Sequence, residues 1–252
     1  MSFVVAAEAY DRFMGRYSTR LAPLFADFGR VSDGQRVIDV GCGPGALTEE
    51  LVRRVGAAAV TAVDPSAPFV SAIEERLPDV DVRLAPAEEL PFDDSSFDVA
   101  LAQLVVQFMQ DPVAGLREMA RVTRDGGIVA ASVWDHGGGH GPLSVLWDVV
   151  CEVDPGARDE SGVVGTHEGD LTGLFEQAGL REIEETALTV SVEHPTFEEW
   201  WEPYTLGVGP AGAYVAGLDP EAQANLRERC RSWLPEPPFV IEASAWSARG
   251  LA

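Results

Sequence analysis

The chain has 252 residues, of which 46% are hydrophobic and 23% charged, a composition typical of a globular protein long enough to bury a full core. Its formal net charge of -23 comes from 41 acidic and 18 basic residues, and every basic residue is arginine. So acidic a surface repels nucleic-acid phosphates, and we expect no direct nucleic-acid binding.

The apolar runs and the cysteines indicate where in the cell the protein is expected. No apolar run approaches the ~18 residues that a membrane span needs, and the first residues lack the basic start of a signal peptide. The three cysteines, Cys42, Cys151 and Cys230, are scattered and odd in number, which argues against a disulfide framework and a zinc site. We therefore expect a cytoplasmic protein with no membrane span and no bound metal.

Residues 1–34 predict an N-terminal helical pair. Tyr10, Met14 and Tyr17 recur at helical spacing, and further apolar residues continue the pattern until glycines end it. Two compatible interpretations stay open. The helices pack on the core, or the stretch from Tyr10 to Tyr17 folds over the following glycine-rich turn as a lid.

The stretch 37–51 reads as a strand, a glycine turn and a helix. A short β-branched run, VIDV, is followed by three alternating glycines, Gly41, Gly43 and Gly45, and then by apolar residues at helical spacing. Glycines let the backbone turn tightly and approach a ligand, and a helix N-terminus offers unpaired N–H groups. This is the local architecture of a nucleotide-type site.

Strand and helix patterns alternate from residue 35 to residue 134. Ser66 is predicted to be the N-cap of the first following helix and Asp111 the N-cap of the second, which Asp125-Gly126-Gly127 is predicted to stop. Repeated β-α-β units with short loops indicate a parallel, doubly wound sheet. Beyond the strand at 37–40, strands are predicted at 58–63, 80–84, within 97–106 and at 128–134, and helices at 66–77 and 112–124.

Residues 135–167 are different: the stretch 136–142, HGGGHGP, predicts a flexible glycine loop, and a helix and a Gly-rich acidic stretch follow it. The last predicted helix of the chain begins at Asp219-Pro220 and carries Leu226, Cys230 and Trp233 inward. From residue 135 onward, helices are predicted at 143–153, 168–178 and within 196–234, and strands at 181–193 and 239–246.

We expect a single domain over residues 1–252. It comprises a helical lid at 1–34, a cofactor-binding core at 35–134 and an acceptor-side half at 135–252, with a helical insertion at about 195–235.

The glycines alone leave two kinds of nucleotide cofactor open. The stretch 41–46, GCGPGA, satisfies the dinucleotide pattern G-x-G-x-x-A as well as G-x-G-x-G. Asp39 ends the preceding strand, where its carboxylate would repel a pyrophosphate and suits a cation such as an amino-acid ammonium. Asp64 ends the next strand, where an acid can accept both ribose hydroxyls of either cofactor. Asp39 therefore favours a cofactor with a cationic end.

Four segments in order resemble the class I S-adenosylmethionine-dependent methyltransferases: VIDVGCGPG, AVDPS, AEELPFDDSSFD and REMARVTRDGG. The resemblance lies closest to the bacterial small-molecule group related to ubiquinone and menaquinone biosynthesis. It implies an α/β fold with a Rossmann-like, mostly parallel, seven-stranded sheet, an N-terminal helical lid and a helical insertion before the last strand. It also implies S-adenosyl-L-methionine as cofactor, S-adenosyl-L-homocysteine as product and a small-molecule methyl acceptor as partner.

The resemblance assigns the methionyl end of the cofactor to the glycine turn. Asp39 is implied to order this turn and to hold the ammonium together with backbone groups around Gly41. Gly43 and Gly45 are implied to allow close approach. Cys42 is expected to be a small residue tolerated beside the ligand rather than a reactive nucleophile.

The lid residues Tyr10, Met14 and Arg16 are implied neighbours of the same end, with Arg16 pairing with the carboxylate. Gln103 and Leu104, which follow the fourth strand, are implied to line the sulfonium side.

Asp64 is the implied ligand of the ribose hydroxyls, and Pro65 and Ser66 are implied to flank the adenine. Ala87 is implied to offer a backbone N–H to the adenine ring. The family commonly has an acid just before this position, where the chain has Pro86. Glu88 is the expected substitute for that acid.

The implied reaction is an in-line displacement on a methyl group, which chiefly requires positioning and exclusion of water. A base is needed only if the acceptor loses a proton, and the candidates are His136, His140 and Gln107, the last by hydrogen bonding alone. Both histidines also fit a solvated loop, and His167 and His194 are predicted to have no functional role.

Five aromatic residues either wall an apolar or aromatic acceptor pocket or simply pack the inserted helices: Trp134, Trp147, Trp200, Trp201 and Tyr204. Two further functions stay open. The chain is a catalytically silent relative that binds the cofactor or a protein, or it is a nicotinamide-dependent (NAD) oxidoreductase. The identity of the acceptor, and whether O-, N- or C-methylation occurs, stays open as well.

Overall fold

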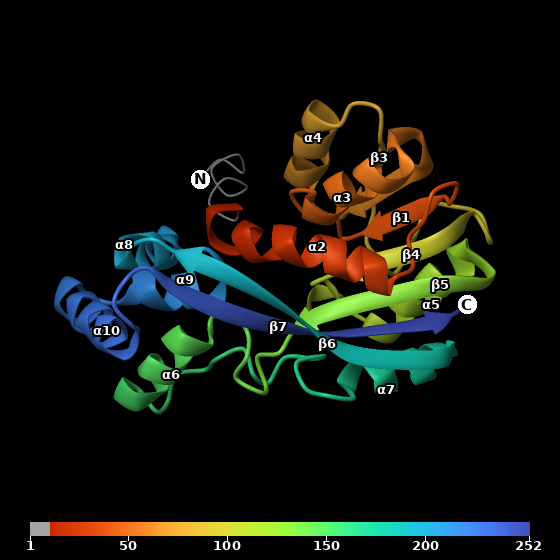
Figure 1. Cartoon of the computed structure of the whole chain (residues 1–252). Helices are drawn as coiled ribbons and strands as arrows, with labels where there is room; N and C mark the ends of the chain where they lie inside the picture. The colour runs from red at the N-terminus through yellow and green to blue at the C-terminus, as the bar shows by residue number, and fades with distance from the viewer. Residues whose placement is uncertain (1–10) are drawn as a thin grey trace.

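The computed structural model describes residues 11–252, which contain one seven-stranded mixed sheet (Figure 1). The strand order is β3-β2-β1-β4-β5-β7-β6. Neighbours among the first five strands pair in parallel, and β7 is antiparallel to both β5 and β6. The predicted α/β, mostly parallel, seven-stranded sheet is confirmed. The strands are β1 (Val37–Val40), β2 (Val60–Asp64), β3 (Asp81–Leu84), β4 (Phe97–Gln103), β5 (Thr123–Trp134), β6 (Arg181–His194) and β7 (Phe239–Leu251).

Strand β1 lies at the point where the order of the sheet reverses. The chain runs outward from β1 through β2 to β3 and returns to β4 on the other side of β1. Every residue of β1 is buried, as expected for a central parallel strand covered on both faces. In such sheets a crevice opens at the carboxyl ends of the strands beside the reversal, so this topology itself locates a ligand site.

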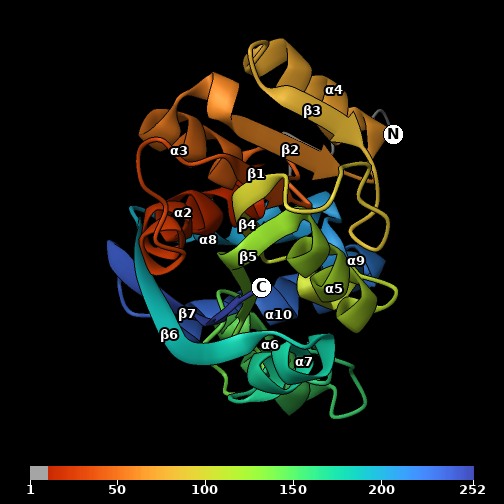
Figure 2. The same cartoon turned by 90° about the vertical axis from the view of Figure 1, so that its right-hand side faces the viewer.

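Helices cover both faces of the sheet (Figure 2). Helices α2 and α3 contribute to the hydrophobic cluster on one face, and α5 and α7 contribute to the cluster on the other. The five-residue π-helix Asp11–Gly15 leads directly into α2. The α-helices are α2 (Arg16–Phe28), α3 (Ala46–Val55), α4 (Ala67–Arg76), α5 (Pro112–Val122), α6 (Ser144–Val153), α7 (Asp170–Ala178), α8 (Phe197–Trp201), α9 (Gly209–Gly217) and α10 (Pro220–Trp233), with short 3-10 helices η2 (Ala57–Ala59), η3 (Val106–Phe108) and η4 (Glu202–Leu206).

Side-chain caps fix several helix starts. Asp111 accepts a hydrogen bond from the Ala114 amide at 3.0 Å, which confirms the predicted N-cap of α5. Ser66 is the N-cap residue of α4, as predicted, although its side chain makes no capping hydrogen bond. The Ser66 amide instead donates to Asp64 Oδ1 at 2.8 Å. The start of α4 is thereby tied to the carboxyl end of β2.

Strand β5 begins earlier than its sequence predicts. Helix α5 ends at Val122, and Asp125-Gly126-Gly127 lies inside β5 rather than in a helix stop. A Cβ on Gly127 would lie 2.6 Å from the Asp98 carbonyl oxygen, so only glycine lets the two backbones come this close. The strand register against β4 shifts at the same place.

The C-terminal half differs from its prediction in two further places. Strand β7 continues to Leu251, because it pairs with β5 along one edge and with β6 along the other. Trp233, predicted to face inward, has 48% of its surface exposed at the end of α10. The predicted helical insertion before the last strand is present as α8, η4, α9 and α10.

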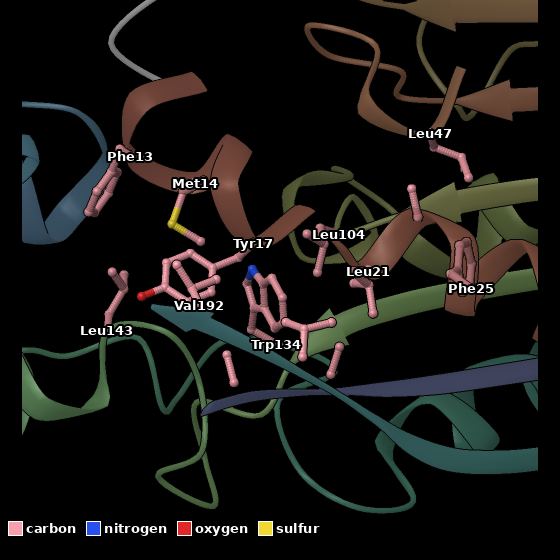
Figure 3. Packing of buried hydrophobic residues seen from close by; sticks show 14 of the residues in the cluster. Phe13, Met14, Tyr17, Leu21, Phe25, Leu47, Leu104, Trp134, Leu143 and Val192 are labelled. Carbon is pink, nitrogen blue, oxygen red and sulfur yellow. The ribbon is translucent and has the colours of Figure 1, made fainter. Parts of the chain in front are cut away.

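Helix α2 lies across the sheet and close to its centre (Figure 3). Its buried residues Tyr17, Leu21 and Phe25 point from the helix toward the strands. None of the helices in residues 11–252 is both long enough and apolar enough to cross a membrane.

The packing of α2 provides a stability test. Phe25 is fully buried, and we expect Phe25→Ala to lower the free energy of unfolding by about 3–5 kcal/mol through lost burial and a cavity. Leu24 is the neighbouring position with an exposed side chain, and Leu24→Ala should cost less than about 1 kcal/mol. Urea denaturation of both variants measures the difference, and equal costs would contradict this packing.

Candidate cofactor site

A cavity of about 380 Å³ opens at the carboxyl ends of β1, β2 and β4. Much of the lining of this cavity was predicted from the sequence, although the wall also contains residues that were not predicted. The predicted cofactor residues found in the wall are Asp39, Gly41, Cys42, Gly43, Asp64, Pro65, Ser66, Ala87, Glu88, Gln103 and Leu104.

The glycine turn forms the floor of the cavity. Gly41, Gly43 and Gly45 all have positive φ angles, of 74°, 51° and 96°. A Cβ on Gly41 would lie 2.4 Å from a methyl carbon of Val105, so both the conformation and the space require glycine there. Gly45 lies at the N-terminus of α3 and outside the cavity wall, where a Cβ would meet the Arg76 guanidinium. The turn therefore brings the backbone of residues 41–43 to the cavity.

Asp39 is a buried acid whose negative charge has little compensation from neighbouring groups. Its carboxylate accepts a hydrogen bond of 2.6 Å from the Thr48 hydroxyl, and only 1% of its surface is exposed. Burial raises the pKa of Asp39 to about 7, the Thr48 hydrogen bond opposes this rise, and the nearby charge of Asp64 adds to it. A bound cation would supply the missing opposite charge.

Asp64 connects two parts of the cavity wall. Its Oδ2 accepts from the Gly43 amide at 2.9 Å and its Oδ1 from the Ser66 amide at 2.8 Å. Burial raises the pKa of Asp64, and these two backbone hydrogen bonds oppose the rise. A carboxylate oxygen has more than one acceptor site, so both oxygens can still accept from ligand hydroxyls.

The loop after β3 forms a further wall, with Pro86, Ala87 and Glu88. Glu88 Oε1 accepts hydrogen bonds from the amides of Gln110 and Asp111 at 2.7 and 3.2 Å. Glu88 thus fastens this loop to the start of α5. Its other carboxylate oxygen accepts no hydrogen bond from residues 11–252.

Several wall residues were not predicted from the sequence, among them Ser18, Phe69, Phe108 and Met109. Ser18 belongs to α2, and its carbonyl oxygen accepts from Gln103 Nε2 at 3.1 Å. Phe69, Phe108 and Met109 add apolar surface, and Phe108 is 73% exposed. The neighbouring apolar residues Phe108 and Met109, shortly after β4, were the one available signal for the last two. Ser18 and Phe69 carry no such signal, because only the fold brings α2 and α4 to the cavity.

The lid residues do not line this cavity. Tyr10 lies outside the described residues. Met14 is buried in the hydrophobic core and absent from the wall. Arg16 donates from its Nη1 to His194 Nδ1 at 3.1 Å, and it too is absent from the wall. A carboxylate contact of Arg16 stays a prediction, without support from this geometry.

The three candidate bases also lie outside the cavity wall. His140 is exposed and its Nδ1 lies 2.8 Å from Asp135 Oδ2. His136 lines a different small cavity, and burial lowers its pKa to about 4. Gln107 donates to the Leu104 carbonyl at 3.0 Å, and its buried Oε1 has no partner among the described residues. No base role is supported for either histidine by its position.

The part of the chain that forms this site is also the part that matches a known protein family. Residues 38–131, from β1 to β5, match the family model of the methyltransferase domain. These residues form a methyltransferase domain. The resemblance to class I S-adenosylmethionine-dependent methyltransferases is thereby confirmed, and the domain contains all of the cavity wall except Ser18.

Curated relatives match about half of the chain or less. An uncharacterized methyltransferase of Mycobacterium tuberculosis is 36% identical over 135 residues, which are 54% of this chain and 52% of the relative. The ubiquinone/menaquinone biosynthesis C-methyltransferase UbiE of Bdellovibrio bacteriovorus is 39% identical over 100 residues, or 38% and 43% of the two chains. The chain therefore spans about half the length of the curated relatives it matches or less.

A solved structure resembles nearly the whole chain. Phosphoethanolamine N-methyltransferase 2 of Haemonchus contortus, in complex with S-adenosyl-L-methionine, superposes with a TM-score of 0.59 at 20% identity. The match covers 97% of this chain and 56% of that one. At this identity the likeness concerns the fold alone.

The buried Asp39 predicts a pH dependence. Its folded-state pKa of about 7 lies above the ordinary 3.8, so between these values the folded state keeps a proton that the unfolded state has released. The free energy of unfolding should therefore fall as pH rises from about 4 to about 7, by up to about 4 kcal/mol from this group. Asp39→Asn, which stays neutral, should remove this fall.

The measurement is urea denaturation of the ligand-free chain at several pH values from about 5 to about 8. Asp33→Asn, at an exposed turn position, is the matched control and should keep the fall. A pH curve that Asp39→Asn leaves unchanged would contradict the assignment.

Proposed function

We propose that the chain transfers the methyl group of S-adenosyl-L-methionine to a small apolar or aromatic acceptor by in-line displacement. The observation that carries this proposal is the buried Asp39 beside the glycine turn, which has a Thr48 hydrogen bond but no ion-pair partner among the described residues. A cationic ligand would relieve the raised pKa of Asp39, whereas the pyrophosphate of a dinucleotide would raise it further. The methyltransferase domain at residues 38–131 supports the same cofactor.

The residues present fit such a cofactor along its length. Asp39 and the backbone around Gly41 would hold its ammonium, and Asp64 would accept from its ribose hydroxyls. Ala87 lies at the predicted adenine position, and its amide donates to no residue within 11–252. Glu88, one of whose carboxylate oxygens accepts no hydrogen bond from residues 11–252, is a suitable acceptor for the adenine amine in place of Pro86.

When bound, this cofactor supplies a methyl group on a positively charged sulfur, which is already a good leaving group. The chain then has to align the acceptor and keep water out. Gln103 and Leu104 at the end of β4 would line the sulfur side of the site, and Gln103 is held in place by the Ser18 carbonyl. The product would be S-adenosyl-L-homocysteine.

A catalytically silent relative is the second candidate, and one observation favours it. Neither candidate histidine reaches the cavity, so any acceptor that must lose a proton would have to do so without them. An acceptor that is already deprotonated removes this requirement. An NAD-dependent oxidoreductase fits less well, because Asp39 disfavours the pyrophosphate.

Asp64→Ala tests the cofactor assignment. We expect a loss of about 1.5–3 kcal/mol in S-adenosyl-L-methionine binding, roughly ten- to 150-fold in Kd, because a charged hydrogen-bond acceptor is removed. Isothermal titration calorimetry measures it, with Asp93→Ala, an exposed acid in the loop before β4, as the control. Unchanged affinity in Asp64→Ala would refute the assignment.

Turnover needs a separate measurement. Release of S-adenosyl-L-homocysteine from the wild-type chain with a library of phenolic, enolic and amine acceptors distinguishes a transferase from a silent relative. Parallel titration with reduced nicotinamide cofactors tests the oxidoreductase, which requires binding of one of them.

A further inference from the structure

Beside the cofactor cavity lies a second, aromatic-walled chamber, which we define by Phe13, Tyr17, Leu143, His194, Trp200 and Tyr204. The two hollows share α2: Ser18 lines the cofactor cavity, and the preceding residue, Tyr17, lines the aromatic chamber. Leu104, a residue of the cofactor wall, belongs to the same buried cluster as Tyr17 and Trp134 (Figure 3). The chamber is therefore next to the predicted sulfur side of the cofactor.

Two hydrogen bonds of His194 determine which group is the donor and which the acceptor at the Tyr17 hydroxyl. Arg16 Nη1 lies 3.1 Å from His194 Nδ1, and because a guanidinium only donates, Nδ1 must be the acceptor. Burial and the Arg16 charge lower the pKa of His194 to about 4, so the ring is neutral and its proton is on Nε2. His194 Nε2 therefore donates to the Tyr17 hydroxyl oxygen, 3.1 Å away.

The Tyr17 hydroxyl is consequently left with a proton to donate. Only 4% of Tyr17 is exposed, and its hydroxyl has no other partner among residues 11–252. Burial also raises the pKa of Tyr17 well above its ordinary value, so the hydroxyl keeps this proton. A buried donor without an acceptor is costly, and an oxygen atom of a ligand in the chamber would satisfy it.

Three further aromatic residues, Phe13, Trp200 and Tyr204, line the chamber. Phe13 meets Tyr204 edge to face with ring centroids 5.2 Å apart, and Trp200 meets Tyr204 at 5.0 Å. Tyr17 meets Trp134 edge to face at 6.3 Å. Such walls favour a planar ring, which gains offset or edge-to-face contacts.

We infer that Tyr17 binds the oxygen of a phenol or enol acceptor and that Arg16 and His194 position its proton for this contact. This inference rests on the proposed transferase function and specifies its acceptor. The hydroxyl group of a phenol or enol is weakly acidic, and its deprotonated oxygen is stabilised by a hydrogen-bond donor and by the Arg16 charge behind His194.

The chamber has to open for this acceptor to enter. Its free volume is about 10 Å³, which is too small for a ring. Phe13 belongs to the π-helical segment Asp11–Gly15, a kind of turn that often marks functional sites. Outward movement of this segment would free the space beside Tyr204 without disturbing Leu21 and Phe25 deeper in α2.

The inference is tested with 4-nitrophenol as probe and 4-nitroanisole, which lacks the hydroxyl, as its matched neutral analogue. Binding to the full chain is followed by difference absorbance at pH 8, with and without S-adenosyl-L-homocysteine. We expect the wild type to bind 4-nitrophenol about tenfold tighter than 4-nitroanisole, and Tyr17→Phe to remove this preference. Tyr214→Phe, whose hydroxyl contacts Asp154 outside the chamber, should keep it.

The positioning role of His194 is tested by two substitutions. His194→Gln keeps an acceptor for Arg16 and a donor for Tyr17, and it should retain the preference and the absorbance shift of bound 4-nitrophenol. His194→Leu should lose both, although Tyr17 itself is intact. Thermal unfolding of each variant confirms that it is folded.

Three results would overturn the inference. They are equal binding of 4-nitrophenol by the wild type and Tyr17→Phe, equal binding of the two probes by the wild type, and no binding of 4-nitrophenol by the folded wild type. Failure of the proposed function would appear separately, as an absence of S-adenosyl-L-methionine binding in calorimetry.

Discussion

The burial of two carboxylates at the reversal of the sheet is the constraint on which the site depends. Asp39 is the second-last residue of β1 and Asp64 is the last residue of β2, and the parallel pairing of the two strands places both at the same edge of the sheet. Neither has an ion-pair partner among the described residues; Thr48 and two backbone amides are their compensation. A native fold that keeps charges this poorly compensated sacrifices stability, and such a cost is expected where a ligand provides the missing charge.

Helix α2 connects the cofactor cavity to the rest of the molecule. It lies outside the matched methyltransferase segment, yet Ser18 lines the cofactor cavity and holds Gln103. On the next residue back, Tyr17 contacts His194 at the end of β6. One turn of this helix therefore lines both the cofactor cavity and the aromatic chamber, so a movement of this turn would affect both.

The sequence predicted those parts of the fold and site that local pattern determines. The glycine turn, Asp39 and Asp64 lie within one strand-turn-helix unit and its neighbour, where spacing alone places them. Strand β5 was misjudged at its start, because the glycines at 126 and 127 resemble a helix stop, and only the nearby Asp98 carbonyl reveals why glycine is needed there.

Contacts between distant residues were beyond the reach of such patterns. His194 was predicted to have no role, yet it is 1% exposed and contacts Arg16 and Tyr17, which precede it by 178 and 177 residues. A single histidine before a proline carries no local signal of that environment. The two histidines of the glycine loop, His136 and His140, had the stronger local signal and lie away from the cavity.

This difference between local patterns and distant contacts explains why the site for the methyl donor is better defined than the site for the methyl acceptor. The matched domain supplies nearly the whole wall of the cofactor cavity, and a few residue types at fixed spacing suffice for the cofactor that we propose there. The aromatic chamber instead takes residues from the π-helical segment, α2, β6, α8, η4 and the loop before α6. A pocket assembled from so many separate segments can change its shape and its polar groups without disturbing the glycine turn. Its chemistry must therefore be derived from the contacts of its own residues, and among these the direction of the Tyr17 proton is the most specific.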